Sequence, residues 1–172
     1  LQYMKTKILS GKEVSASVYS DIKSRIDTLR SREITPNLSV LLVGNNPASE
    51  VYVNSKSKRF SKLGLLSETI KLPEDISQDH LISKIEELNE DNKIHGILVQ
   101  LPLPKHIDTD SIIKAINPQK DVDGFHPYNL GSLLMGNPQF IPCTPKGIMR
   151  IFEYYQIDLS GVHVVVVGRS NI

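Results

Sequence analysis

Hydrophobic positions follow two different spacings along the chain, and the alternation of these spacings predicts helices separated by strands. The first apolar positions recur every three or four residues behind Ser10. Ser10 is followed three residues later by Glu13, which is the form of a capping box. The pattern predicts an amphipathic helix with an inward face made of Val14, Val18, Ile22, Ile26 and Leu29.

Short apolar runs predict β-strands at 38–43, 65–71 and 94–101. Asn46 and Ser77 are predicted to cap helices that follow two of these strands. The helical patterns lie at 47–63, from Ser77 onward, and at 108–116. Strands separated by helices are typical of βαβ units, so we predict an α/β fold with a parallel sheet covered on both faces.

The pattern weakens between 118 and 142 into a long loop with one short apolar element at 130–135. Thr144 is then predicted to cap a further helix. The buried face of that helix is expected to contain Ile148, Ile151, Phe152 and Tyr155. The β-branched run at 162–167 predicts a buried parallel strand.

These patterns divide the chain into two predicted parts. Residues 1–143 are expected to form an amino-terminal catalytic domain. Residues 144–172 are expected to be a linker helix and the first strand of a second α/β domain, because a domain does not naturally end just past its first strand.

Composition excludes several classes of function. Twenty Lys and Arg residues balance nineteen Asp and Glu residues, so the net charge of +1 leaves no surplus for binding nucleic acid. No run approaches about 18 apolar residues, which argues against a membrane span. The only cysteine, Cys143, rules out an intramolecular disulfide and suits a reducing compartment such as the cytoplasm. The five histidines lack metal-ligand spacing, so no metal is expected.

One lysine is a candidate for proton transfer. On the helix predicted at 47–63, Lys56 shares a face with Tyr52, Phe60 and Leu63. Burial disfavours the charged form of a lysine, which lowers its pKa and makes it usable as a proton carrier. The alternative is that Lys56 lays its carbon chain on the core and extends its amine to water.

Polar residues also occur where ligands bind in parallel sheets, beyond the carboxyl ends of the strands. Gln100 follows a predicted strand and has an amide able to orient a lysine or a substrate carbonyl; alternatively it satisfies local backbone groups. Asp121 and Asp123 lie on a turn with Gly124. A carboxylate there can accept two parallel hydrogen bonds from a planar N–H pair, although exposed acids in an Asx turn are the commoner case.

Taken together and in this order, the motifs resemble one family, the bifunctional methylenetetrahydrofolate dehydrogenase/cyclohydrolases. The resemblance covers nearly the whole chain from about Ile8. It is carried by Val43–Ser49, Tyr52–Lys56, Gly96–Pro104, Lys120–Gly124, Pro142–Gly147 and Val166–Ser170.

The resemblance implies roles for individual residues. Lys56 would be the central catalytic residue of the hydrolytic step, and Gln100 would hydrogen-bond it. Tyr52 would pack against the folate rings, and Asp123 would hold the pterin edge. All four are expected to be catalytic, and the expected substrate-binding residues are Tyr52, Gln100, Leu101, Pro102 and Asp123. The expected cofactor-binding residues are Thr144, Gly168, Arg169 and Ser170, with Arg169 suited to a 2′-phosphate.

The implied protein is a cytoplasmic, homodimeric enzyme of one-carbon metabolism and purine biosynthesis. Its folate cleft would lie between the amino-terminal domain and a Rossmann-like NADP domain, of which residues 144–172 would be the start. It would use NADP to oxidise methylenetetrahydrofolate and then hydrolyse the product to formyltetrahydrofolate. The chain departs from the family because the rest of the glycine-rich cofactor loop and a later Pro-Gly-Gly segment are absent. The alternatives are a monofunctional dehydrogenase of the same fold, a non-catalytic folate-binding fragment, and an unrelated α/β dehydrogenase with a similar amino-terminal domain.

Overall fold

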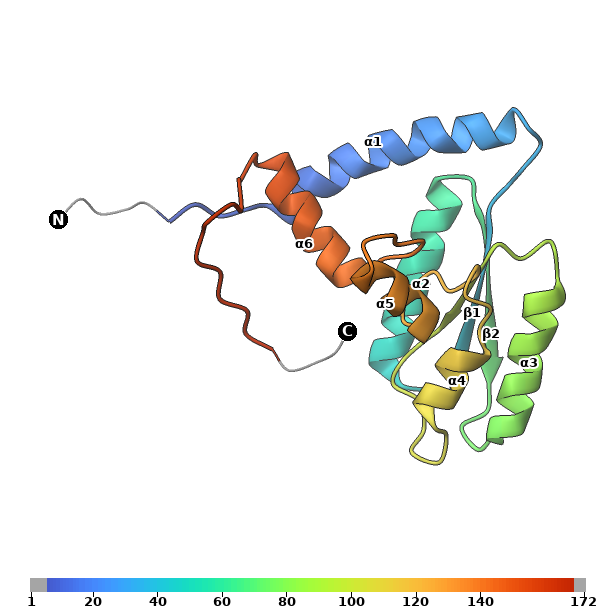
Figure 1. Cartoon of the computed structure of the whole chain (residues 1–172). Coiled ribbons are helices and arrows are strands. Elements are labelled where there is room, and N and C mark those ends of the chain that lie inside the picture. The colour runs from blue at the N-terminus through green and yellow to red at the C-terminus, as the bar shows by residue number, and fades with distance from the viewer. Residues whose placement is uncertain (1–5, 169–172) are drawn as a thin grey trace.

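A computed structural model describes residues 6–168 and contains a three-stranded parallel sheet (Figure 1). The strands are β1 (Asn37–Val43), β2 (Leu66–Leu72) and β3 (Gly96–Val99), arranged in the order β2-β1-β3. The three predicted strands are confirmed, although β3 is shorter than the run at 94–101. No helix of the described residues is both long enough and apolar enough to cross a membrane.

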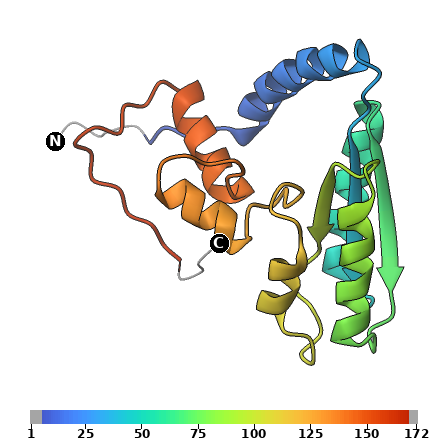
Figure 2. The same cartoon turned by 45° about the vertical axis from the view of Figure 1, so that its right-hand side comes forward.

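Helices cover both faces of the sheet, as predicted (Figure 2). Side chains of β1 alternate between the two faces because successive residues of a strand point in opposite directions. Leu41 and Val43 pack in the cluster formed with α3 (Gln78–Glu90) and α4 (Thr109–Ala115). The other cluster is formed with α2 (Pro47–Lys62) and contains Leu38, Val40, Leu42, Val53 and Leu98, with Phe60 packed against it.

Two of the predicted helix caps are confirmed. Asn46 Oδ1 accepts a hydrogen bond from the Ser49 amide at 3.1 Å at the start of α2. At the start of α3, Ser77 Oγ accepts one from the His80 amide at 3.2 Å. These bonds satisfy amides that the first turn of a helix leaves unpaired.

The predicted capping box at the start of α1 (Gly11–Arg30) is wrong, because the Ser10 side chain makes no cap hydrogen bond. Instead, the Ser10 amide donates to the hydroxyl of Tyr155 at 2.8 Å. The same hydroxyl donates to the Glu13 carboxylate at 3.2 Å. Ser10 and Glu13, which were predicted to bond each other, are therefore both bonded to Tyr155, a residue distant in sequence.

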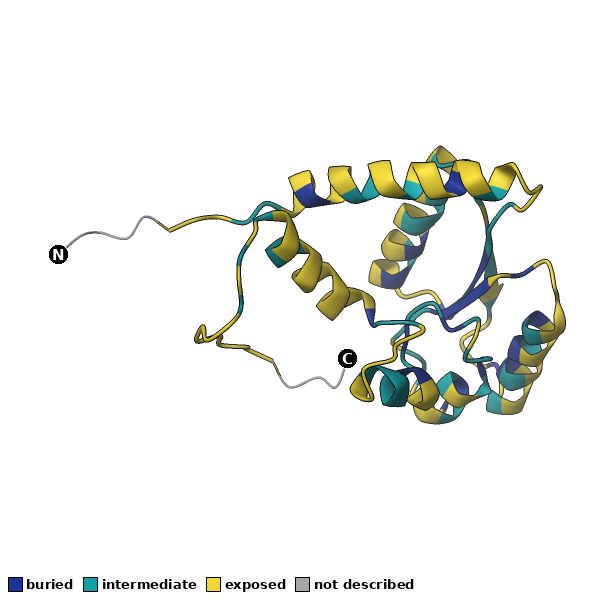
Figure 3. Ribbon diagram, turned by 45° about the horizontal axis from the view of Figure 1, so that its top comes forward, coloured by how far each residue is buried: buried dark blue, intermediate teal, exposed yellow. Residues whose placement is uncertain are grey.

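The carboxyl-terminal part differs from the prediction in three ways. The apolar element at 130–135 belongs to a helix, α5 (Pro127–Leu134). The last helix, α6 (Cys143–Tyr154), has Pro142 and not Thr144 at its N-cap, and Thr144 lies exposed in its first turn. No residue of α6 is fully buried, and Figure 3 shows the helix mostly exposed. Of the predicted inward face, Ile151, Phe152 and Tyr155 are half-buried and Ile148 is exposed, so the face is only partly covered.

The predicted strand at 162–167 is not formed, and its valines are exposed. A parallel strand needs a neighbouring strand for its backbone hydrogen bonds, and no strand of the described residues pairs with this run. Val166 is 86% exposed and Val167 is 96% exposed.

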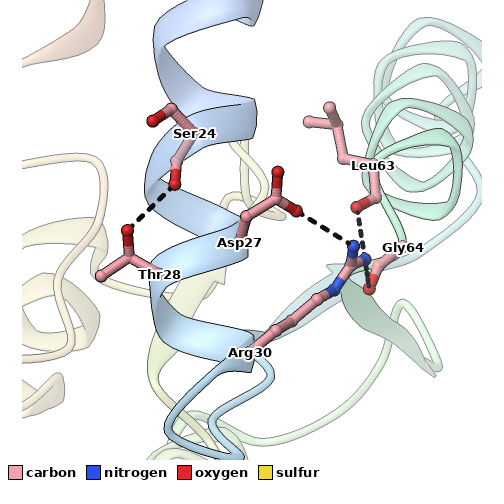
Figure 4. A network of polar contacts seen from close by, with 6 residues as sticks. All are labelled: Ser24, Asp27, Thr28, Arg30, Leu63 and Gly64. Atoms are coloured by element: carbon pink, nitrogen blue, oxygen red, sulfur yellow. Dashed lines mark hydrogen bonds and ion pairs between the residues drawn. The ribbon is translucent and has the colours of Figure 1, made fainter.

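Arg30 ties the end of α1 to the end of α2 (Figure 4). Its Nη2 donates to the carbonyl oxygens of Leu63 at 2.9 Å and Gly64 at 3.0 Å. Asp27 lies 3.7 Å from its other terminal nitrogen. Gly64 has a φ of +66°, a left-handed conformation that lets the chain leave α2 and enter β2.

Gly64→Ala is expected to destabilise the protein by about 2 kcal/mol. A side chain at a left-handed position is strained. The new Cβ would also clash with Arg30 Nη2, which must then move away from both carbonyls. Urea unfolding measures the change. Gly131→Ala is the matched control, because nothing lies within 4 Å of its Cβ in α5 and alanine favours a helix. Equal effects of the two substitutions would contradict the argument.

Candidate active site

Lys56 of α2 and Gln100, the residue after β3, meet at the carboxyl end of the sheet. Lys56 Nζ donates to Gln100 Oε1 at 3.3 Å. Gln100 Nε2 donates to the carbonyl oxygen of Leu101 at 2.7 Å, which keeps the amide oxygen turned toward the lysine. The Lys56–Gln100 contact that the resemblance implied is therefore present, while the catalytic roles of both residues stay predictions.

The inward face of α2 differs from the expected one, in which Tyr52, Lys56, Phe60 and Leu63 shared a single apolar face. Val53 is buried and Phe60 packs on the sheet, so these two form the inward face of the helix. Lys56 lies at the edge of that face and is half-buried. Tyr52, one turn before Lys56, is 65% exposed and leaves its ring free to pack against a planar ligand.

Leu101 and Pro102 continue the chain from Gln100 at the same edge of the sheet. Leu101 is half-buried, Pro102 is exposed, and the peptide bond between them is cis. Leu101 and Pro102, two of the five expected substrate-binding residues, therefore directly follow the Gln100 side of the Lys56–Gln100 pair.

The two aspartates at 121 and 123 have separate surroundings. Asp121 is buried, and its carboxylate accepts hydrogen bonds from the amides of Gly124 at 3.1 Å and His126 at 2.8 Å. The buried Asn129 Nδ2 donates a third bond at 2.8 Å. The alternative that Asp121 is a solvent-exposed acid in an Asx turn is therefore wrong. Its buried carboxylate stabilises the loop by accepting these hydrogen bonds. Neither this role of Asp121 nor the buried Asn129 was predicted, because no spacing in the sequence marks a side chain that closes a loop from inside.

Lys120 fastens the same loop to the rest of the domain. Its Nζ donates to the carbonyl oxygens of Leu88, Asn89 and Asp91 at 2.9, 2.6 and 2.8 Å, at the carboxyl end of α3. A cation is favourable there because the last carbonyls of a helix are unpaired and carry partial negative charge. Lys120 and Asp121 together give the loop a fixed position.

Asp123 is half-buried on this loop, near enough to Lys56 for their charges to interact. Burial raises the pKa of the Asp123 carboxyl, the positive charge of Lys56 opposes that rise, and the negative charge of Asp121 adds to it. Lys56 therefore hydrogen-bonds Gln100 and interacts electrostatically with the Asp123 carboxyl.

The start of α6 reaches the same place. Cys143 is exposed as a residue, but partial desolvation of its thiol raises the thiol pKa. The charge of Asp123 raises this pKa further, while Lys146 and Lys56 act in the opposite direction. Cys143 therefore stays protonated near neutral pH, which fits its interpretation as a residue without a nucleophilic role. Gly124, with a φ of +71°, permits the approach, since a Cβ there would lie 3.0 Å from the Pro142 nitrogen.

The expected cofactor residues are not gathered into a site within the described residues. Thr144 and Gly168 are exposed, and Arg169 and Ser170 lie outside the described residues. The extended, unpaired run at 162–167 does not form the strand–turn–helix unit that holds a dinucleotide pyrophosphate. Nor do any three His, Cys, Asp or Glu side chains between residues 6 and 168 lie together as metal ligands would.

Comparison with protein families gives two matches along the chain. A model described as the catalytic domain of tetrahydrofolate dehydrogenase/cyclohydrolase matches residues 9–123, and these include Lys56, Gln100 and Asp123. The chain belongs to the tetrahydrofolate dehydrogenase/cyclohydrolase family. A second model of this family, its NAD(P)-binding domain, matches residues 142–172.

Individual members of the tetrahydrofolate dehydrogenase/cyclohydrolase family agree with this assignment. The bifunctional protein FolD of Enterococcus faecalis is 52% identical over 165 residues, which are 96% of this chain and 59% of that protein. This chain thus spans about three fifths of the length of such relatives.

Solved structures of the family share the fold. The crystal structure of the bifunctional FolD enzyme of Campylobacter jejuni has a TM-score of 0.93 and 47% identity, and the match covers 96% of this chain and 59% of that chain. The Trypanosoma brucei enzyme, complexed with NADP and an inhibitor, has a TM-score of 0.85 and 30% identity, covering 91% of this chain and 54% of that chain.

Proposed function

We propose that this protein is an NADP-dependent methylenetetrahydrofolate dehydrogenase that also hydrolyses methenyltetrahydrofolate to formyltetrahydrofolate. The observation that carries the proposal is the convergence of Lys56, Gln100 and Asp123 at the carboxyl end of a parallel sheet, in a chain of this family. The relatives from Enterococcus faecalis and Campylobacter jejuni are both named as bifunctional, which supports two activities over a dehydrogenase alone.

Substrate binding follows from the chemistry of the side chains. The Asp123 carboxylate accepts two hydrogen bonds from the N–H pair at the pterin edge, a geometry that a planar ligand can match. The exposed ring of Tyr52 packs against the folate rings. Leu101 and Pro102 line the site beside Gln100. These contacts orient the one-carbon unit toward Lys56.

In the hydrolytic step, Lys56 manages the proton. Water adds to the methenyl carbon, which is already an electrophile, and Lys56 in its neutral amine form takes up one of the two water protons. The bond between that carbon and one of its two nitrogens then breaks, and Lys56 gives its proton to that nitrogen. The hydroxyl on the carbon loses the second proton to solvent, so a formyl group remains on the other nitrogen. Gln100 keeps the amine in position through its 3.3 Å contact.

The cofactor part of the proposal rests on residues 142–172 and on the NADP bound by the Trypanosoma brucei relative. When bound, NADP accepts the hydride from methylenetetrahydrofolate. Arg169 is suited to the 2′-phosphate that distinguishes NADP from NAD. The division of the chain into a folate domain at 1–143 and the start of a cofactor domain at 144–172 belongs to the same proposal.

Three further parts of the proposal rest on family membership alone. The enzyme is expected to work as a homodimer, to act in the cytoplasm, and to supply one-carbon units for purine biosynthesis. Its partners are then tetrahydrofolate derivatives.

Asp123→Asn tests the substrate assignment. The substitution is expected to weaken folate binding roughly tenfold to a hundredfold, because a hydrogen bond to a charged group contributes about 1.5–3 kcal/mol. Calorimetric titration of the whole protein, as encoded in its source genome, measures this, and NADP affinity is expected to stay unchanged. Asp110→Asn, an exposed aspartate in α4, is the control. Unchanged folate affinity of the Asp123 variant would remove Asp123 from the site.

The same variant has a second readout in stability. Because the pKa of Asp123 is raised in the fold, ionising this carboxyl costs folding free energy once the pH exceeds its unfolded value. Asp123→Asn removes that cost, so the variant is expected to be more stable than the wild type at neutral pH. The gain should disappear as the pH falls below about 4, the ordinary aspartate pKa. Urea unfolding at several pH values measures it, and a loss of stability at neutral pH would contradict the assigned burial of Asp123.

A further inference from the structure

A groove of about 640 Å³ lies between α1 and α2, apart from the candidate active site. Lys23 of α1 and two cations near the end of α2, Arg59 and Lys62, line it. Lys56 does not line it. The groove begins one turn beyond Lys56, toward the carboxyl end of α2.

The groove has positive charge and no carboxylate among its lining residues. Within residues 6–168, none of Lys23, Arg59 and Lys62 takes part in an ion pair. The two acids nearest to Lys23 along α1 are Asp21 and Asp27, and neither lines the groove. Asp21 is paired with Arg150 at 3.4 Å, and Asp27 is paired with Arg30 at 3.7 Å. Three cations that face one cavity repel each other, so an anion bound there gains attraction from all three.

The remaining lining residues add hydrogen-bonding groups and an apolar surface. Arg59 Nη1 donates to the hydroxyl of Tyr19 at 2.9 Å, which fixes one side of the guanidinium and leaves its other N–H groups available. Ser15 and Ser20 contribute two further hydroxyls on α1. Ala16, Leu63 and the ring of Tyr19 give the groove apolar contact area.

We propose that this groove binds a small phosphate ester with an apolar or planar body. The groove offers a guanidinium, two ammonium groups and two serine hydroxyls. These are more positive charges and hydrogen-bond donors than a carboxylate ligand, with its single negative charge, could pair with. They match the double charge and three free oxygens of a phosphate monoester. A volume of about 640 Å³ lies within the range of small-molecule sites and is far larger than a phosphate group, so the body of the ester occupies the rest. This site is additional to the proposed folate site.

The first test locates the site in the unmutated protein. The probe is 4-nitrophenyl phosphate, titrated into isotopically labelled protein while backbone amide shifts are recorded. Saturable shifts confined to residues 15–23 of α1 and 59–63 of α2 are expected, with a Kd at or below about 1 mM that rises with salt. Inorganic phosphate, which lacks the body, is expected to bind more weakly. Shifts centred on Lys56, Gln100 and Asp123, or no saturation by about 10 mM, would overturn the proposal.

The second test compares two variants of equal charge change. In the first variant, Lys23→Gln, Arg59→Gln and Lys62→Gln are combined; it is expected to bind 4-nitrophenyl phosphate at least about tenfold more weakly. The second variant combines Lys12→Gln, Arg25→Gln and Lys58→Gln, three exposed cations that do not line the groove. It is expected to change the affinity by less than about twofold. Equal losses in the two variants would mean that the probe follows net charge, and the groove site would be wrong.

Discussion

Lys56→Met is expected to lower the hydrolysis of methenyltetrahydrofolate by at least about 10²-fold, the lower end of what a general acid or base contributes. Methionine has a similar length and volume but no group that takes up a proton. The fold should survive, because Lys56 is only half-buried and makes one side-chain hydrogen bond, the 3.3 Å contact to Gln100. The measurement is the rate of methenyltetrahydrofolate consumption by the whole protein.

The control for this variant lies on the same helix. Lys58→Met removes an exposed lysine two residues away and is expected to leave the hydrolytic rate within about twofold, since surface substitutions have small effects. Circular dichroism verifies that both variants are folded. A turnover of the Lys56 variant close to that of the wild type would exclude Lys56 as the proton carrier.

Asp121→Ala is expected to destabilise the protein by about 3–5 kcal/mol. The carboxylate accepts hydrogen bonds from the Gly124 and His126 amides and from Asn129 Nδ2, and Asp121 is only 2% exposed. Its removal leaves the His126 amide and one N–H of Asn129 without an acceptor in a region that water reaches poorly. The Gly124 amide keeps its 3.2 Å bond to the main-chain carbonyl of residue 121, and the Asn129 amide keeps its 3.0 Å bond to the Pro118 carbonyl. Because the same loop presents Asp123, folate binding should weaken as well.

Urea unfolding compares this variant with Asp91→Ala, which removes an exposed aspartate whose carboxylate accepts from the Lys93 amide. The control is expected to cost less than about 1 kcal/mol. Equal costs for the two variants would show that the Asp121 network does not hold the loop.

Local sequence patterns predicted the elements of the first 116 residues well. The caps at Asn46 and Ser77 and the strands at the centre of the sheet depend on residues close to one another in sequence. The meeting of Lys56 with Gln100 also follows from sequence order, because consecutive βα units bring their loops to one edge of a parallel sheet.

Predictions that depended on distant residues were less successful. The Ser10 capping box failed because Tyr155, 145 positions away, occupies both of its partners. The strand at 162–167 failed because its β-branched residues favour an extended backbone but provide no neighbouring strand to pair with it.

The sequence by itself determined the α/β class, the family motifs and the position of Lys56 and Gln100 at one edge of the sheet. Only the tertiary structure separated the two aspartates, which look alike in the sequence. Asp121 is enclosed by amides of its own loop and by Asn129, whereas Asp123 lies beside Lys56. The reason is that burial and hydrogen bonding depend on which groups the folded chain brings within about 3 Å, and sequence spacing does not specify this in an irregular loop.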